Sequence, residues 1–231
     1  MTATGTGGEG VGMEGSGARH GDATADEPGR LMGHGHHDVL AGVFFGGRRR
    51  RVFLRLAAAS GARPGDRVLD VGCGTGYFTR VMATVVAPGG TTHGVDPSRE
   101  AITHAQRVTH LTNCTFSEGI AQELDASDGS YDVVVSSLML HHLADAVRPQ
   151  AVGEMSRVLR PGGSLLIAEF RPPSSRIGRR LISAHSPAMA SSRVVDLLEP
   201  IVREAGFEQP RSGDLRPWIH YVSALKPASA R

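Results

Sequence analysis

The sequence contains a single lysine, Lys226, and only two cysteines, Cys73 and Cys114. Almost all of its positive charge is therefore arginine, yet the formal net charge of +2 is too small to indicate a polyanionic partner. Two cysteines are too few for a disulfide framework, and they suit a reducing compartment. We therefore expect no nucleic-acid partner and a cytoplasmic location.

Long apolar runs are also missing. No stretch approaches the length that a membrane-spanning helix requires, and the N-terminal residues lack the basic and apolar segments of a signal peptide. We expect neither integral membrane association nor secretion. The 231 residues are enough for one domain, and 40% hydrophobic with 21% charged residues is an ordinary globular composition.

Large apolar residues are almost absent from residues 1–30, where glycine, threonine, alanine and acidic residues dominate. Such a segment cannot bury enough surface to offset its conformational entropy, which predicts a disordered Gly-rich tail. Within the segment 31–62, apolar residues recur at helical spacing from Asp38 to Ser60, with an interruption at Gly46-Gly47. This pattern predicts two short helices or one kinked helix, and we expect the folded domain over 63–231.

From residue 63 onward short apolar runs alternate with helix-like stretches, and the run Val133–Val135 is apolar on both faces. Continuous apolar strands imply a sheet covered on both sides, and repeated strand–helix–strand order requires parallel pairing. We predict a Rossmann-like, doubly wound α/β fold with a mostly parallel seven-stranded sheet, helices on both faces and an N-terminal helical lid. Strands are expected at 67–71, 91–95, 113–117, 131–136, 164–169, 207–212 and 217–225, helices at 77–86, 98–108, 149–159 and 193–205, and a Pro-Gly-Gly turn at 161–163.

The strongest local signal is the stretch 68–76, an apolar strand that ends in a turn with Gly72, Gly74 and Gly76. Glycine lets the backbone approach a nucleotide-like ligand closely at the carboxyl end of a parallel strand. A tight turn that binds no ligand would show the same glycines. The turn is therefore a candidate ligand site that needs support from other residues.

Asp96 gives that support, because a carboxylate after the second strand can accept hydrogen bonds from both ribose hydroxyls of a nucleoside. The alternative is that Asp96 caps the helix that begins near Ser98. A dinucleotide-binding fold shares these features, but its fingerprint needs glycine at the position of Tyr77. A ligand without pyrophosphate fits better, which leaves an NAD-dependent oxidoreductase as the less favoured alternative.

Taken together, several segments resemble the class I S-adenosylmethionine-dependent methyltransferases, from about Arg63 to the C-terminus. One further segment resembles the subgroup of ubiquinone and menaquinone biosynthesis methyltransferases and their small-molecule relatives. The segments that carry the family resemblance are Val68–Gly76, Gly94–Asp96, Gly119–Asp132 and Leu159–Gly163, and the subgroup resemblance rests on Ser137–Leu143.

The resemblance implies an enzyme that uses S-adenosyl-L-methionine to methylate an O, N or C atom of a small organic acceptor by in-line displacement. It places the methionine part of the cofactor at Asp70 and the glycine turn, the ribose at Asp96, and adenine near Pro97. The implied cofactor-binding residues are Asp70, Gly72, Cys73, Gly74, Gly76, Asp96, Pro97, Ile120 and Ala121.

Ile120 departs from the family pattern, in which an aspartate commonly accepts a hydrogen bond from the adenine amino group. Isoleucine cannot accept that bond, although its backbone amide and its side chain can still contact adenine. We expect cofactor binding to persist, weakened by roughly 1 kcal/mol. One alternative is a chain that has lost cofactor affinity, and another is a non-catalytic S-adenosylmethionine-binding or regulatory module of the same fold.

Methyl transfer from a sulfonium chiefly needs alignment and exclusion of water, and a general base helps when the acceptor is a phenol, hydroxyl or ammonium. His141 and His142, just beyond the fourth strand, are the candidate catalytic residues. The alternative is that the pair only shapes the pocket. Glu169 at the end of the fifth strand is a further pocket candidate, with a solvent-facing charge as its alternative.

Two other motifs carry weaker signals. The histidines of 34–37 lack a fourth ligand at recognisable spacing, so we predict no metal site. With Phe44 and Phe45 they could line a lid, or this segment could pack on the core as a helix. Arg48–Arg51 could meet phosphate, an acidic acceptor or a membrane surface, but four consecutive charges usually form a solvated helix face. The acceptor and the oligomeric state stay open.

Overall fold

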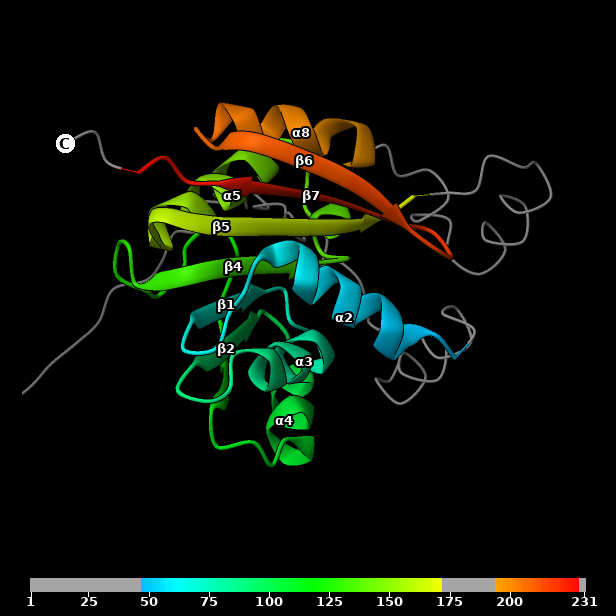
Figure 1. Ribbon diagram of the computed structural model, residues 1–231, viewed down its shortest axis with the longest axis vertical. Helices are drawn as coiled ribbons and strands as arrows, with labels where there is room; N and C mark the ends of the chain where they lie inside the picture. Colours follow the sequence, from blue (N-terminus) through cyan, green and yellow to red (C-terminus); the bar gives the residue numbers. More distant parts are fainter. Residues whose placement is uncertain (1–46, 172–193, 229–231) are drawn as a thin grey trace, which may run out of the picture. The chain divides into compact units, whose positions relative to one another are not determined.

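The computed structural model describes residues 47–171 and 194–228. Their seven strands form one sheet in the order β3-β2-β1-β4-β5-β7-β6, in which β7 alone runs in the direction opposite to the other six. The predicted Rossmann-like fold with a mostly parallel seven-stranded sheet is confirmed (Figure 1). The elements are α2 Arg49–Ser60, β1 Arg67–Val71, α3 Tyr77–Val85, β2 Thr91–Asp96, α4 Arg99–Val108, β3 Cys114–Glu118, β4 Tyr131–Ser137, the 3₁₀ turn η1 Leu140–His142, α5 Arg148–Val158, β5 Leu159–Phe170, α8 Val194–Glu204, β6 Glu208–Leu215 and β7 Ile219–Leu225.

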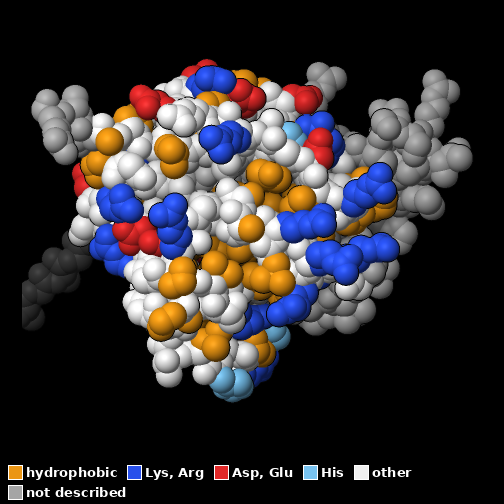
Figure 2. Space-filling view, in the orientation of Figure 1, with side chains coloured by type: hydrophobic (Ala, Val, Ile, Leu, Met, Phe, Trp, Pro, Cys, Tyr) orange, Lys and Arg blue, Asp and Glu red, His pale blue; other side chains and the backbone are white. Residues whose placement is uncertain are grey.

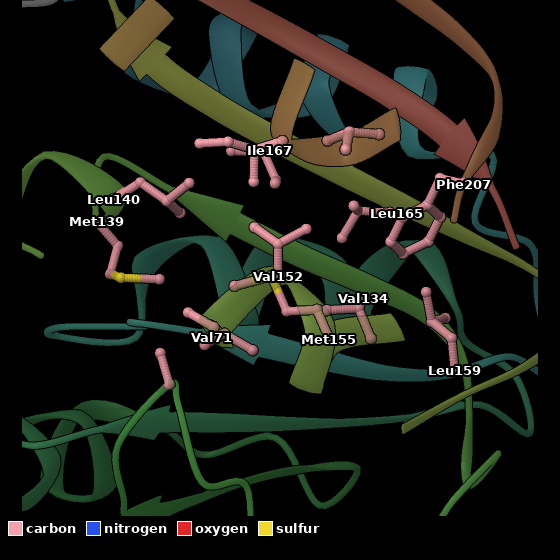
Figure 3. Packing of buried hydrophobic residues seen from close by; sticks show 14 of the residues in the cluster. Val71, Val134, Met139, Leu140, Val152, Met155, Leu159, Leu165, Ile167 and Phe207 are labelled. Carbon is pink, nitrogen blue, oxygen red and sulfur yellow. The ribbon is translucent and has the colours of Figure 1, made fainter. Parts of the chain in front are cut away.

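Helices cover both faces of the sheet, which explains why its central strands are apolar throughout. Val133 and Val135 of β4 pack in one core cluster with residues of α2 and α3. Val134, between them, points to the opposite face and packs with Val152 and Met155 of α5 and with residues of α8 (Figure 3). Because side chains of a strand alternate between faces, β4 must be apolar at each of these positions.

The described part of the segment 31–62 is a helix that packs on the sheet. Val52, Phe53, Leu56 and Ala57 of α2 are buried, and the helix lies against α3, β5 and β7. The tail 1–30 and residues 31–46, which include the histidines of 34–37, Phe44 and Phe45, lie outside the described residues. The division into tail, lid and domain therefore stays a prediction. None of the helices in 47–171 and 194–228 is long and apolar enough to cross a membrane.

The prediction of a separate turn at 161–163 was wrong. Helix α5 ends at Val158, and β5 already begins at Leu159, which pairs with Tyr131 before the register shifts to Val133 and Ser164. The Pro-Gly-Gly segment is thus a bulge inside β5, because two hydrogen bonds hold its backbone to the end of β7. The amide of Gly162 donates to the Lys226 carbonyl at 3.0 Å, and the Lys226 amide donates to the Gly163 carbonyl at 2.8 Å.

Lys226 also fastens the end of α5. Its Nζ donates hydrogen bonds to the carbonyl oxygens of Ser156 and Leu159, both at 2.7 Å. These carbonyls lie at the C-terminal end of the helix, where intrahelical donors run out and a positive charge is favourable. The sole lysine of the chain therefore joins α5, the start of β5 and the end of β7.

Candidate functional site

The glycine turn between β1 and α3 is bonded to the end of the neighbouring strand β2. The amides of Gly72 and Cys73 both donate to the carbonyl oxygen of Val95, at 2.8 and 3.0 Å. The two strand ends are therefore joined at the carboxyl edge of the sheet, which is the usual ligand edge of an open α/β sheet.

Two glycines of this turn have opposite surroundings. A Cβ on Gly72 would lie 2.2 Å from Cγ of Met139, so the Met139 side chain fills the space beside this glycine. A Cβ on Gly74 would meet no described atom within 4 Å, although its φ of +51° still favours glycine. The turn is therefore packed against protein at Gly72 and open at Gly74. Gly76, with φ of +74°, precedes the first residue of α3 and packs against Phe116.

Asp96 joins the turn to the start of α4. Its Oδ2 accepts a hydrogen bond from the Gly74 amide at 2.8 Å, and its Oδ1 accepts one from the Ser98 amide at 2.9 Å. Ser98 itself caps α4, since its hydroxyl accepts from the Ala101 amide at 3.2 Å. The predicted alternative of a role at the helix start is thus real, but it does not compete with ligand binding. A carboxylate has about four lone-pair sites, and these two bonds occupy only half of them.

Asp70 is fully buried on β1 and faces α3. Its Oδ2 accepts a hydrogen bond from the Thr79 hydroxyl at 2.7 Å, whereas its Oδ1 has no hydrogen-bond partner among the residues described. Burial raises the pKa of Asp70 to about 7, the Thr79 bond opposes this, and the charge of nearby Asp96 adds to it. Asp70 therefore has a buried oxygen that can still accept a hydrogen bond from a donor at the turn.

The predicted adenine segment adjoins Asp96. The Gly119 amide donates to the backbone carbonyl of Asp96 at 3.2 Å, Ala121 is buried, and the Ile120 side chain is 39% exposed. Pro97 is exposed as well. The structure thus brings the glycine turn, Asp96, Pro97 and Gly119–Ala121 to one edge, with Pro97 and Ile120 leaving apolar surface at it.

Arg157 of α5 fixes the rest of this segment. Its guanidinium donates to the carbonyls of Leu124 and Ala126 at 2.9 and 2.7 Å, and to Asp128 at 2.8 Å. Glu154, which pairs with Arg157, accepts a hydrogen bond from the Leu124 amide at 2.9 Å. The predicted adenine segment is therefore held against α5 by bonds that the sequence did not predict.

The fourth strand ends in a strained turn beside the glycine turn. Leu138 has φ of +57°, a left-handed conformation that bulky residues rarely adopt, and its amide donates to the Ala168 carbonyl at 2.8 Å. Met139 then packs at Gly72, and η1 carries His141 and His142. Strain of this kind concentrates at functional sites and persists only where the surroundings hold it.

His141 and Glu169 form a buried pair at the ends of β4 and β5. The distance from His141 Nδ1 to Glu169 Oε2 is 2.8 Å, and the two side chains are 7% and 1% exposed. The alternative that Glu169 is a solvent-facing charge is therefore wrong. His142 is exposed, and its ring lies 4.1 Å from the ring of His141. Sequence reasoning named these residues but missed the pairing, which depends on β4 and β5 being neighbours in register.

The arginines at the start of α2 lie outside this edge cluster. Figure 2 shows Lys and Arg side chains gathered over α2, where Arg48, Arg50 and Arg51 are exposed. The Arg49 guanidinium instead stacks over the ring of Tyr77 at 3.8 Å. Three of the four arginines therefore form a solvated helix face, and one packs beside the first residue of α3.

Two open hollows of about 650 and 600 Å³ lie away from the glycine turn. The first is lined by the exposed arginines of α2, and the second by residues of α8, β6 and β7 together with Arg171. We place the candidate site at the glycine turn and not in these hollows, because the turn combines an open glycine with two carboxylates that can still accept hydrogen bonds. Within 47–171 and 194–228 no three histidine, cysteine or acidic residues are grouped to hold a metal ion.

Comparison with known proteins agrees with this geometry. Residues 68–163 match the family described as "Methyltransferase domain". The chain is 32% identical over 201 residues to the ubiquinone/menaquinone biosynthesis C-methyltransferase UbiE of Vibrio campbellii, covering 76% of this chain and 77% of that one. It is 32% identical over 148 residues to the demethylmenaquinone methyltransferase of Symbiobacterium thermophilum, covering 62% of this chain and 58% of that one.

The crystal structure of a SAM-dependent methyltransferase from Aquifex aeolicus shares the fold, with a TM-score of 0.68 and 18% identity over 82% of this chain and 97% of that one. Against the first relatives found, the chain spans 31%, 58% and 59% of their length. The match to the UbiE enzyme is nevertheless long enough on both sides to assign a family. The chain belongs to the class I S-adenosylmethionine-dependent methyltransferases, whose cofactor is S-adenosyl-L-methionine.

Proposed function

We propose that this protein transfers a methyl group from S-adenosylmethionine to an O, N or C atom of a small organic acceptor. The observation that carries the proposal is the position of Asp96, which holds the glycine turn through Gly74 and keeps acceptor capacity for a ribose. When bound, the cofactor supplies an electrophilic methyl group on a sulfonium. The protein's own task is to align the acceptor and to exclude water.

The residues present fit this cofactor. Gly74 lacks a Cβ where the turn is open, and the Asp70 carboxyl keeps one buried oxygen without a partner in the described chain. We propose that the cofactor-binding residues are Asp70, Gly72, Cys73, Gly74, Gly76, Asp96, Pro97, Ile120 and Ala121, as the family resemblance implies. His141 and His142 are the proposed catalytic residues.

A cytoplasmic setting without a nucleic-acid partner belongs to the same proposal. The cytoplasmic setting is supported by the two cysteines, because Cys73 and Cys114 are both free thiols, and burial raises the pKa of each. Thiols of this kind behave as small apolar side chains rather than as disulfide partners. The net charge of +2 gives no support to nucleic-acid binding.

Calorimetric titration with S-adenosylmethionine and S-adenosylhomocysteine tests the cofactor site. Loss of charge-assisted hydrogen bonds in Asp96→Ala should weaken binding by about 10- to 100-fold, corresponding to roughly 1.5–3 kcal/mol. Asp196→Ala, at an exposed aspartate of α8 away from the glycine turn, is the matched control and should bind like the parent protein.

Absence of saturable binding by the parent protein would refute the proposed cofactor site. Binding without a methylated product from any acceptor would instead favour a non-catalytic S-adenosylmethionine-binding module. That alternative is motivated by Ile120, which lacks the acceptor oxygen common in the family. Nicotinamide binding would support the remaining alternative, an oxidoreductase, which Tyr77 at the start of α3 disfavours.

A further inference from the structure

The pair His141–Glu169 is joined by one contact of 2.8 Å between Nδ1 and Oε2. With Glu169 as the acceptor, which is the only role open to an ionised carboxylate, Nδ1 of His141 carries the hydrogen. In the neutral imidazole the lone pair then lies on Nε2, the nitrogen that does not contact Glu169. Because both side chains are almost completely buried, this arrangement is protected from competition by water.

The turn that carries His141 is held from two sides. Met139 packs against Gly72 of the glycine turn, and the Leu138 amide is bonded to Ala168, the residue before Glu169. The buried guanidinium of Arg148 donates to the Leu140 carbonyl at 3.0 Å, directly beside His141. His141 is therefore fixed at the carboxyl edge that holds the proposed cofactor site, without depending on a flexible loop.

Two buried polar atoms beside the pair have no hydrogen-bond partner within the described chain, Oε1 of Glu169 and Oγ of Ser136. Ser136 pairs with Ile167 on β5, so its side chain lies on the same face of the sheet as that of Glu169, two residues further along. Buried polar atoms are costly unless they are paired. Neither atom has exposed surface, so the two leave the interior beside the pair polar rather than offering contacts to an acceptor.

Resting on the proposed methyltransferase function, we propose that His141 is the general base, that Glu169 is its positioning residue, and that the acceptor carries an ionisable O–H or N–H. The acceptor oxygen or nitrogen forms a bond to the methyl carbon while the carbon–sulfur bond breaks and its electron pair stays on sulfur. The acceptor proton moves to Nε2 of His141. Glu169 stabilises the resulting imidazolium, which returns its proton to water.

Other charged groups surround this pair and enter its pH dependence. The ring of His142 lies against that of His141, and Asp145 forms an ion pair with Arg148 after η1. His220, the β7 residue that pairs with Glu169, contacts Asp214 of β6 and Arg171, which follows β5. Nδ1 of His220 lies 2.8 Å from both Oδ1 of Asp214 and a guanidinium nitrogen of Arg171. The groups are His142, Asp145, Arg148, Arg171, Asp214 and His220.

The tautomer of His141 tests the pair without cofactor or acceptor. Long-range ¹⁵N–¹H NMR spectra of protein labelled with ¹⁵N-histidine should show the Nδ1–H form in the parent protein. Glu169→Leu removes the acceptor and should abolish this preference, whereas Glu204→Leu, at an exposed glutamate of α8, should leave it intact. A parent protein with hydrogen on Nε2, or a tautomer unchanged in Glu169→Leu, would overturn the proposed pair.

Kinetics test the catalytic role, with catechol as the O–H probe and phenylethylamine as the N–H probe. The nearly isosteric Glu169→Gln and the variant His141→Asn should each lower kcat by about 100-fold and leave the KM for S-adenosylmethionine largely unchanged. The rate of the parent protein should fall at acidic pH, because a protonated His141 cannot accept the acceptor proton, and this fall should be absent in His141→Asn. His110→Asn, at an exposed loop histidine, should keep both the rate and the pH profile.

The outcomes separate the two proposals. Cofactor binding with product from neither probe would overturn the assigned acceptor class, and equal loss of rate in His110→Asn would overturn the role of His141. Failure of the parent protein to bind S-adenosylmethionine would instead sink the proposed function, while the tautomer would still decide whether Glu169 orients His141.

Discussion

Asp70 illustrates how one buried residue couples stability to pH. Burial raises the pKa of Asp70 to about 7, above the model-compound value of 3.8. A carboxyl with a raised folded-state pKa binds its proton more tightly in the folded state than in the unfolded state. Its contribution to stability is therefore present below about pH 4 and is lost as pH rises to about 7.

Asp70→Asn should remove this loss, because the amide cannot ionise. We expect the difference between the free energies of unfolding, variant minus parent, to increase by up to roughly 4 kcal/mol as the pH rises from 4 to 7. Urea unfolding of the cofactor-free protein at several pH values measures it. A difference between the two proteins that stays constant across this interval would contradict the raised pKa.

Ile120 offers a test of the adenine contact. Replacing it by aspartate restores the acceptor oxygen that the family commonly has, at a position whose side chain is 39% exposed and therefore tolerant of a carboxylate. Ile120→Asp should tighten S-adenosylmethionine binding by about fivefold, corresponding to roughly 1 kcal/mol. Calorimetry checks this, and S-adenosylhomocysteine should gain equally because the two ligands share adenine. Unchanged affinity would place adenine elsewhere.

The turn between β1 and α3 acts as one element in which each glycine has a separate task. Gly72→Ala should destabilise the fold by about 2 kcal/mol or more, because its Cβ would collide with Met139 and its φ of +74° disfavours alanine. Gly74→Ala meets no described atom within 4 Å, so only the cost of its backbone conformation, about 1 kcal/mol, is expected.

Gly74→Ala, the less destabilising of the two substitutions, should have the larger effect on cofactor affinity. A methyl group at Gly74 would project into the open side of the turn and should lower S-adenosylmethionine affinity by at least about tenfold, equivalent to roughly 1.4 kcal/mol. Thermal unfolding measures the stability of both variants, and calorimetry measures their affinity for S-adenosylmethionine. Full affinity in a folded Gly74→Ala protein would show that the cofactor does not approach the turn at this glycine.

Most strands and helices could be predicted from the sequence because their signals are local. The apolar run Val133–Val135 predicts a buried strand, and the Gly-Cys-Gly-Thr-Gly sequence predicts a tight turn between a strand and a helix. The Pro-Gly-Gly segment was wrongly predicted to be a separate turn, because its conformation is set by pairing with Lys226, more than sixty residues away along the chain. The pairing of His141 with Glu169 was equally invisible, because it depends on strand order and on which face each side chain takes.

Cofactor binding and the folding of the protein are thermodynamically linked. A ligand that binds only the folded state at about 100 times its Kd adds roughly 2.7 kcal/mol of stability. For a chain of this length that should raise the Tm by about 5–10 °C. Thermal unfolding with and without S-adenosylmethionine measures the shift, and Asp96→Ala should lose most of it at the same ligand concentration. A Tm that does not respond to the ligand would contradict the proposed site.

The reactivity of the Lys226 amine can report local opening of the protein. It is the only lysine side chain in the sequence, and its amine is bonded to two carbonyls at the end of α5. An amine-acylating reagent therefore has one side chain to label, and the amine must leave these carbonyls before it can react. The labelling rate at Lys226 would thus measure how often the junction of α5, β5 and β7 opens, with no probe introduced.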